Sequence, residues 1–142
     1  MLPVPFLAVM DKTGFLINTW KLTMSKFSSK RNKAFRIQAG RCIYCNAPMW
    51  QDDPDRFASA HGLSRAEAKH FQCTAEHRKA RCDGGSNEIG NIAAACRYCN
   101  QGRHRRNARL SSDEFLAFVR NRLKKGKWHP ACIHARLSGV AR

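Results

Sequence analysis

Acidic residues are scarce in this chain, and their scarcity restricts the partners that the chain can have. Asp and Glu together number 10 against 26 Lys and Arg, which gives a formal net charge of +16. The basic residues are spread along the chain rather than confined to one tail. Because such an excess repels itself unless a partner neutralises it, a merely solvated surface is the weaker interpretation, and the charge predicts contact with nucleic acid.

Long hydrophobic runs are also absent. The segment 1–10 is apolar, but Asp11 and Lys12 end it and no basic segment precedes it. No stretch reaches the roughly 18 apolar residues that span a bilayer. We therefore expect neither secretion nor a membrane partner. Met24 is an alternative start of the chain.

The length of 142 residues provides for one modest core, so we expect a single domain. The expected organisation is an N-terminal appendage over residues 1–24, the domain itself over residues 25–126, and a basic tail over residues 127–142. The order of the two end segments is left open at this point.

Capping residues and glycines predict the helices of the domain. The predicted helices are a short basic one from Ser28 or Ser29 to Ile37, one opened by the capping box Ser64–Glu67, one over residues 97–106 with its arginines outward, and an amphipathic one from Ser111 or Ser112 to Gly126. Residues 51–55 are expected to form a loop.

A two-stranded element is expected between these helices. Residues 71–77 have the character of a strand, and residues 83–87 contain the paired glycines of a tight turn. Glycine can adopt positive φ in such a turn at no steric cost. The chain then returns through residues 91–95 toward the next cysteine.

Cysteine is abundant for this length, with seven residues, and four of them form the Cys-x-x-Cys pairs Cys42/Cys45 and Cys96/Cys99. This spacing places two thiolates on one tight turn, and two such pairs supply the four ligands of a closed tetrahedral zinc site with Zn–S bonds of about 2.3 Å. A closed site is structural. Thiolates at metal-ligand spacing favour a cytoplasmic location over a disulfide framework.

The remaining cysteines, Cys73, Cys82 and Cys132, have no partner at this spacing. We expect them to be buried free thiols. The alternatives are that Cys73 and Cys82 face each other across the turn, or that these cysteines form a second metal site with Cys132 or His134.

One ordered pattern connects the two cysteine pairs: Glu76-His77, Gly84-Gly85, Asn91 and then Cys96-x-x-Cys99-Asn100. The combined pattern, over about residues 27–106, resembles an HNH endonuclease of the His-Me finger (ββα-metal) type. The resemblance implies an α+β fold with a small ββα-metal core, a structural four-cysteine zinc site and flanking helices. The sequence departs from the commonest form of the family at Glu76, where aspartate is usual, and at Ala80, where a proline often follows the histidine.

The resemblance also implies the roles of the residues. His77 is the general base, Glu76 and Asn100 are ligands of a catalytic divalent ion, and Asn91 braces the loop and the histidine. Hydrolysis near neutral pH needs a proton acceptor, and histidine, whose ordinary pKa is about 6.5, is suited to that task.

The oxygen atoms of Glu76 and Asn100 are ligands that a hard divalent cation prefers, with Mg²⁺ the default and Mn²⁺ a substitute. His104 lies one helical turn beyond Asn100, so it is a further candidate ligand or phosphate contact, the alternative being a solvated histidine.

Basic side chains on and just beyond the predicted helix are candidates for phosphate contacts, because guanidinium groups pair with phosphate oxygens. These nucleic-acid-binding candidates are Arg97, Arg103, Arg105 and Arg106. Arg109 and the basic cluster at residues 30–33 are explained as well by a solvated surface.

The predicted function is a metal-dependent HNH endonuclease that hydrolyses DNA phosphodiester bonds as a monomer or homodimer. The alternatives are a non-catalytic zinc-containing module that binds nucleic acid, and a nuclease that acts on RNA. Glu76, His77 and Asn100 together favour catalysis, because binding alone requires neither a base nor two converging oxygen ligands.

Overall fold

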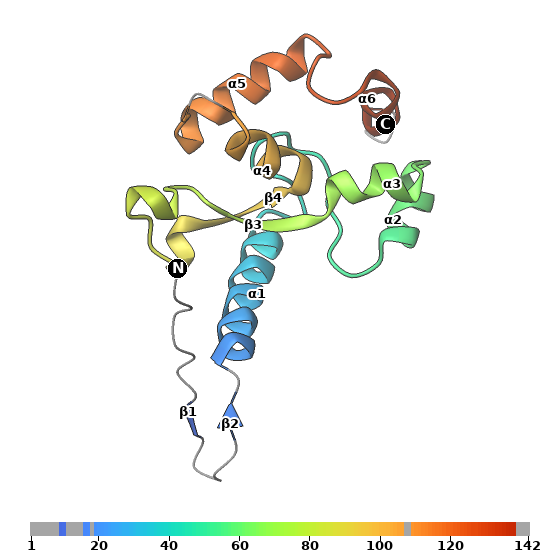
Figure 1. Ribbon diagram of the computed structural model, residues 1–142. Helices are drawn as coiled ribbons and strands as arrows, with labels where there is room; N and C mark the ends of the chain where they lie inside the picture. Colours follow the sequence, from blue (N-terminus) through green and yellow to red (C-terminus); the bar gives the residue numbers. More distant parts are fainter. Residues whose placement is uncertain (1–8, 11–15, 18, 107–108, 139–142) are drawn as a thin grey trace, which may run out of the picture.

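The computed structural model describes residues 9–10, 16–17, 19–106 and 109–138 (Figure 1). Its helices are α1 (Thr19–Ile37), α2 (Pro54–His61), α3 (Arg65–Ala68), α4 (Arg97–His104), α5 (Ser112–Lys124) and α6 (Ala131–Ser138). Its strands are β1 (Val9–Met10), β2 (Leu16–Ile17), β3 (Cys73–His77) and β4 (Ile92–Cys96). The mixture of helices with a small antiparallel sheet confirms the predicted α+β class.

Strands β3 and β4 form the antiparallel hairpin on which the rest of the domain is built. Their register runs from Cys73 opposite Cys96 to His77 opposite Ile92, which confirms the two-stranded element predicted across the glycine turn. All five residues of β4 are buried, because α1 lies against one side of the hairpin and α4 against the other (Figure 1).

Helix α1 also covers the free edge of β4. The side chain of Gln38, just past the helix, donates to Ala94 O at 2.8 Å and accepts from Ala94 N at 2.9 Å. These two bonds replace the strand partner that an edge strand lacks. The chain turns at Gly40, whose φ is +72° and whose N–H donates to Phe35 O, as is typical of a glycine that follows a helix.

The helix begins earlier than expected. Its first residue is Thr19, not Ser28 or Ser29, so α1 crosses the boundary that we expected at residue 24. In the rest of the predicted appendage, residues 9–10 and 16–17 form β1 and β2, and residues 1–8, 11–15 and 18 lie outside the described residues.

Residues 51–53 form part of the loop expected at residues 51–55, but α2 begins within that range, at Pro54. Asp53 caps it by accepting a hydrogen bond from Arg56 N, Pro54 occupies its first turn, and Gly62 ends it in the left-handed conformation. Helix α3, by contrast, begins with the predicted capping box, since Ser64 and Glu67 each accept the other's backbone N–H.

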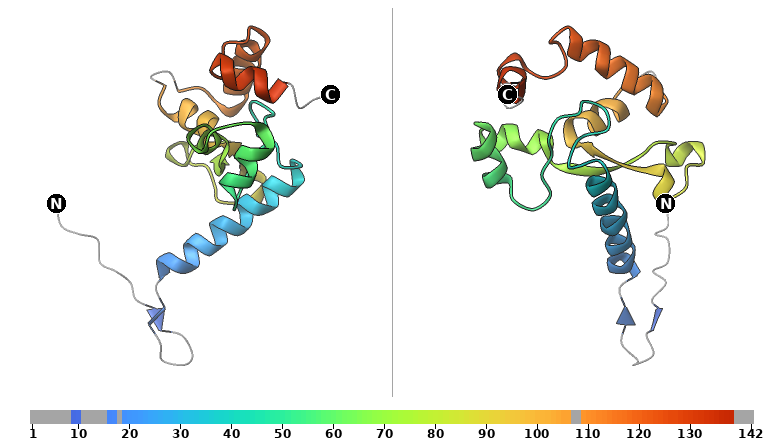
Figure 2. Two further views of the ribbon diagram at one scale, coloured as in Figure 1. Left: turned by 90° about the vertical axis from the view of Figure 1, so that its right-hand side faces the viewer. Right: turned by 180° about the vertical axis from the view of Figure 1, so that it is seen from behind.

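The C-terminal segment, whose order the sequence left open, packs against the domain. Trp128, His129 and Ile133 are buried in the core, and α6 is joined to α3 by an ion pair between Arg136 and Glu67 at 3.1 Å. Apolar burial of this kind, rather than the basic residues of the segment, determines where it lies. Figure 2 shows α6 beside α2 and α3, on the far side of the hairpin from α1.

Helix α5 begins where it was predicted, with a capping box formed by Ser111 and Glu114. Gly126, with φ +62°, follows its end. Among the described helices, none is both long and apolar enough to cross a membrane.

Candidate functional site

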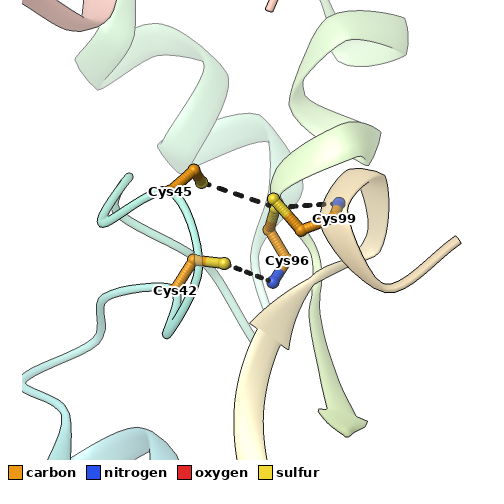
Figure 3. Close-up of side chains that lie close together, drawn as sticks. All are labelled: Cys42, Cys45, Cys96 and Cys99. Carbon is orange, nitrogen blue, oxygen red and sulfur yellow. Dashed lines mark hydrogen bonds between the residues drawn. The ribbon is translucent and has the colours of Figure 1, made fainter. Parts of the chain in front are cut away.

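The two Cys-x-x-Cys pairs meet in one place, as their spacing predicted. The four sulfur atoms of Cys42, Cys45, Cys96 and Cys99 all lie within 4.8 Å of one another, and all four residues are buried (Figure 3). Cys42 and Cys45 come from the turn after α1, whereas Cys96 ends β4 and Cys99 lies in the first turn of α4. The cluster therefore ties three segments of the fold together.

The geometry of this cluster fits a tetrahedral metal ion. The sulfur atoms of Cys45 and Cys96 are 3.8 Å apart, and two sulfurs bonded to one tetrahedral ion at about 2.3 Å lie about 3.8 Å apart. Backbone N–H groups donate to the sulfurs of Cys42 and Cys96 at 3.3 and 3.4 Å, and Trp128 Nε1 donates to Cys99 at 3.3 Å. Such donors stabilise thiolates.

The thiols of this cluster share negative charge unevenly. Although burial raises the pKa of Cys42, hydrogen bonds from Cys45, Cys96 and Cys99 hold that pKa well below its usual value. Burial raises the pKa of Cys96 and Cys99 well above their usual values. A divalent cation at the centre would favour the thiolate form of all its ligands, since metal binding displaces thiol protons. The donor set and its spacing thus suit structural zinc.

The other cysteines differ from one another. Cys73 is a buried free thiol, as predicted, but Cys82 and Cys132 are exposed, because each lies on a surface turn or helix rather than against the core. Within the described parts of the chain, the four-cysteine cluster is the one group of three or more Cys, His, Asp or Glu side chains placed to hold a metal.

Glu76 lies at the centre of a second polar cluster. The residue is 1% exposed, because strand alternation turns this side chain from β3 toward α4. Tyr44 OH donates to Glu76 Oε1 at 2.9 Å. Burial, followed by the nearby carboxylate, raises the pKa of Tyr44, so the phenol remains a donor. No local pattern pointed to this partner, which is 32 residues away from Glu76.

Arg103 is the second partner of Glu76, and its position corrects an expectation. We predicted that Arg103 would face outward and bind phosphate, but the residue is 7% exposed and its guanidinium pairs with Glu76 Oε1. It also donates to the backbone oxygens of His77 at 2.9 Å and Arg78 at 3.1 Å. A buried carboxylate needs a cation and donors to offset its lost hydration, and Arg103 supplies both.

His104 is the third partner, and its distance from Glu76 can be compared with the spacing of two ligands on one ion. Its Nε2 atom lies 3.2 Å from the other carboxylate oxygen, Oε2 of Glu76. Oxygen and nitrogen ligands lie about 2.0–2.2 Å from an ion, so two of them on one ion are separated by about 3 Å. The oxygen that Arg103 leaves unused therefore fits, with the His104 imidazole, as one half of a metal site.

Asn100 lies one turn earlier on α4, on the same face as His104. Its side-chain amide donates to Thr74 Oγ1 at 2.9 Å and to Ala75 O at 3.1 Å. These bonds fasten α4 to β3. They place Asn100 beside the strand rather than in hydrogen-bond contact with the Glu76 carboxylate, to which the described residues contribute Tyr44, Arg103 and His104.

His77 follows Glu76 on β3 and its ring takes a different direction, since adjacent strand residues alternate. His77 Nε2 lies 2.9 Å from Asn87 Oδ1, in the loop that joins β3 to β4. The candidate base and the candidate metal ligand are thus neighbours in sequence at the end of one strand, each held by a different set of partners.

Asn91 connects the two sides of that loop. Its Oδ1 accepts from Lys79 N at 2.8 Å, and its Nδ2 donates to Lys79 O at 3.0 Å and to Ser86 O at 2.8 Å. The backbone of Asn91 also pairs with the strand end, where Arg78 N donates to Asn91 O at 2.9 Å. These bonds hold the loop in the form that presents residues 86 and 87 to His77.

The other arginines that were predicted to contact phosphate lie at opposite ends of α4. Arg97, at its start, donates to Gln72 Oε1 at 3.4 Å, away from Glu76. Arg105 and Arg106 are exposed beyond its end, where Arg106 lies 4.0 Å above the Phe118 ring. A cleft of about 250 Å³ at this end is bordered by His104, Arg106 and Arg109. Cationic side chains thus lie beside His104, the partner of Glu76, at this end of α4.

A comparison with models of known protein families finds a match, and the matched segment contains Glu76 and its neighbours. Residues 64–106 match the family model described as HNH endonuclease, a segment that contains Glu76, His77, Asn91 and His104 together with the second cysteine pair. No curated protein and no solved structure matches the chain at a significant level.

Proposed function

We propose that this chain is a metal-dependent endonuclease that hydrolyses DNA phosphodiester bonds, in keeping with the match of residues 64–106 to the HNH endonuclease model. The observation that carries the proposal is the meeting of Glu76 Oε2 with His104 Nε2 at 3.2 Å, next to a histidine at the following position of the same strand. A carboxylate, an imidazole and an adjacent base are the side chains that such a hydrolysis uses.

Glu76 and His104 would hold the catalytic divalent ion, with Mg²⁺ or Mn²⁺ the candidates. When bound, such an ion would polarise the phosphate and neutralise charge on the leaving 3′ oxygen. Arg103 pairs with Glu76 through Oε1 and fixes the orientation of the carboxylate, which leaves Oε2 directed at His104. Asn100 contributes by fastening α4 to β3, and in our proposal its amide oxygen remains an additional ligand candidate.

His77 would act as the general base that removes a proton from the attacking water. The end of β3 holds its backbone rigidly, because Arg103 donates to His77 O and Asn91 bridges the loop that follows. In-line attack by this water would leave a 5′ phosphate and a 3′ hydroxyl.

Nucleic acid would approach at the end of α4, where Arg105, Arg106 and Arg109 are exposed. Arg103 has no part in this contact, because its guanidinium is committed to Glu76. With a formal charge of +16, the chain would bind its substrate largely through phosphates, and the affinity would fall as salt rises.

A second candidate function is a zinc-containing module that binds nucleic acid without cutting it. The observation in its favour is that Arg103 already neutralises Glu76, so the carboxylate is satisfied without a metal ion. The two candidates predict the same binding and differ only in cleavage.

Nicking of supercoiled plasmid tests the proposal. The wild-type chain with Mg²⁺ or Mn²⁺ should nick the plasmid, and His77→Ala should lose at least about 100-fold in rate, since a positioned base contributes roughly 10²–10⁴-fold. His70→Ala, which removes an exposed histidine outside the cluster, should retain the rate. Equal cleavage by wild type and His77→Ala would defeat the assignment of the base, and binding without cleavage would favour the non-catalytic module.

A further inference from the structure

The loop between β3 and β4 brings one unanticipated side chain to His77. Asn87 is not part of the motif that drew attention to this region, yet its Oδ1 lies 2.9 Å from His77 Nε2. An amide oxygen can only accept a hydrogen bond. The contact is a hydrogen bond when Nε2 carries the ring proton, and in a neutral ring that tautomer has Nδ1 as the basic nitrogen.

The position of Asn87 is itself fixed from two directions. Lys30, on α1, donates to Asn87 O at 2.5 Å, although it lies 57 residues away in the sequence. On the other side, Ser86 O accepts from Asn91 Nδ2 at 2.8 Å, and Ser86 Oγ accepts from Glu88 N at 3.3 Å. The residue that contacts the histidine is thus tied to the helix and to the base of its own loop.

The tightness of the loop explains one of its two glycines. A Cβ atom on Gly85 would lie 1.9 Å from the backbone oxygen of Lys79, so only glycine lets the two sides of the loop approach so closely. Gly85 N donates to Ala80 O at 2.9 Å across the same gap. This close approach brings residues 86 and 87 back toward the end of β3.

We propose that Asn87 is a positioning residue for His77, and that its side-chain oxygen holds the imidazole with the proton on Nε2 and with Nδ1 as its proton-accepting atom. Lys30 supports this arrangement by anchoring the backbone of Asn87. Which nitrogen of a histidine carries the proton is set by the hydrogen bond of the other nitrogen, and a base held in the wrong tautomer cannot accept a proton where it is needed.

The tautomer proposed for His77 is argued from its contact with Asn87, whereas its importance for cleavage rests on the proposed function. The two parts are therefore tested by separate measurements on the zinc-loaded, full-length chain.

The first measurement is the ¹⁵N-resolved proton NMR spectrum of the histidine rings. The signal of His77 is assigned as the one that is missing from the spectrum of His77→Gln. In alkaline buffer, where the imidazole is neutral, wild type should show a ring proton on Nε2 that is protected from exchange with solvent. Asn87→Asp should retain it, because a carboxylate also accepts a hydrogen bond, and Asn87→Ala should lose the protection. A protected proton on Nδ1, or an unchanged Nε2 signal in Asn87→Ala, would overturn the proposal.

The second measurement is the rate of plasmid nicking. Asn87→Ala should lower kcat about 10-fold while leaving KM near its wild-type value. A loss of this size is part of the roughly 10²–10⁴-fold in rate that a positioned base contributes. Asn121→Ala, an exposed amide on α5, is the matched control and should leave both parameters unchanged. A rise in KM with unchanged kcat would assign Asn87 to substrate binding and overturn its positioning role.

The two proposals fail in different ways. If wild type does not cleave, the proposed function fails, and the ring spectrum still decides whether Asn87 orients His77. If wild type cleaves and Asn87→Ala shows the wild-type spectrum and rate, the inference about Asn87 fails while the nuclease remains. Circular dichroism of each variant shows whether the fold is retained.

Discussion

The guanidinium of Arg103 and the carboxylate of Glu76 form an ion pair beneath the surface, with side chains that are 5% and 1% exposed. The pair joins α4 to β3, and through the backbone oxygen of His77 it also joins the proposed metal ligand to the proposed base. Because two charges are buried together, the loss of either one has consequences for both stability and activity.

Arg103→Ala should destabilise the fold by about 3–5 kcal/mol, because it leaves the Glu76 carboxylate buried without its cation. Urea denaturation followed by circular dichroism measures the change. Arg103→Lys should lose less, since it keeps the charge but not the forked donors. Arg136→Ala, which removes the exposed partner of Glu67, is the control and should shift the midpoint little. Equal midpoints for Arg103→Ala and wild type would contradict the role of the pair.

Cys96→Ser should lose zinc and much of the fold, since binding of a structural metal contributes directly to the free energy of folding. Elemental analysis and circular dichroism measure the two effects. Cys132→Ser, at an exposed thiol, should retain both zinc and structure. Stoichiometric zinc in Cys96→Ser would show that the four-thiolate site is not the one occupied.

His104→Ala should raise the concentration of metal that half-saturates cleavage, with a larger effect for Mn²⁺ or Ni²⁺ than for Mg²⁺. The reason is that imidazole binds transition-metal ions better than it binds Mg²⁺, which prefers oxygen ligands. Titration of each metal in the plasmid assay measures the change, expected at about 10-fold or more for the transition metals, as for the loss of other groups around metal sites. An unchanged metal dependence would leave His104 as a hydrogen-bond partner of Glu76 only.

Arg106→Ala and Arg109→Ala should weaken DNA binding at every sequence tested, because contacts to phosphate carry no base information. Each variant should also reduce the slope of log affinity against log salt by about 1. Fluorescence anisotropy over a range of salt concentrations gives both quantities. Arg56→Ala, on α2, is the control, and an equal loss in that variant would point to diffuse attraction rather than a surface at the end of α4.

His129 should make the fold less stable in mild acid. Burial lowers its pKa to about 4, whereas the unfolded chain has an ordinary histidine pKa of about 6.5. The unfolded state therefore binds more protons between these values, so stability is intact above about pH 6.5 and is lost as the pH falls toward about 4.

The difference attributable to His129 between about pH 7 and about pH 5 is roughly 2 kcal/mol. Denaturation of wild type and His129→Leu at both pH values isolates it, since other titrating groups contribute equally to the two proteins. A pH dependence that is the same in both proteins would refute the assignment.

Much of the fold could be predicted because its signals are local. The capping boxes at residues 64–67 and 111–114 place the starts of α3 and α5 within one or two residues, and the glycine turn places the hairpin. Helix α2 begins inside the expected loop, although Asp53, Pro54 and Gly62 are the residues typical of a helix start and end. The residues that begin and end α2 are recognisable in the sequence, but the three polar residues that precede Pro54 also suit a loop.

The differences at Arg103 and at residues 128–138 share a physical cause. Arg103 was expected at the surface because of its charge, and residues 127–142 were expected to form a basic tail whose order was left open. Their burial depends instead on partners far away in sequence: Glu76 for Arg103, and the rings of Phe71 and Tyr98 for His129. A local pattern contains no information about such partners.

The sequence by itself determined the cysteine spacing, the order of the HNH motif and the residues that begin and end helices, because each of these depends on neighbours along the chain. Only the tertiary structure decided that Arg103 neutralises Glu76, that His104 shares that carboxylate, and that Asn87 meets His77. These contacts join residues 10 to 28 positions apart. Such pairs are selected by the packing of α4 and the β3–β4 loop against the hairpin.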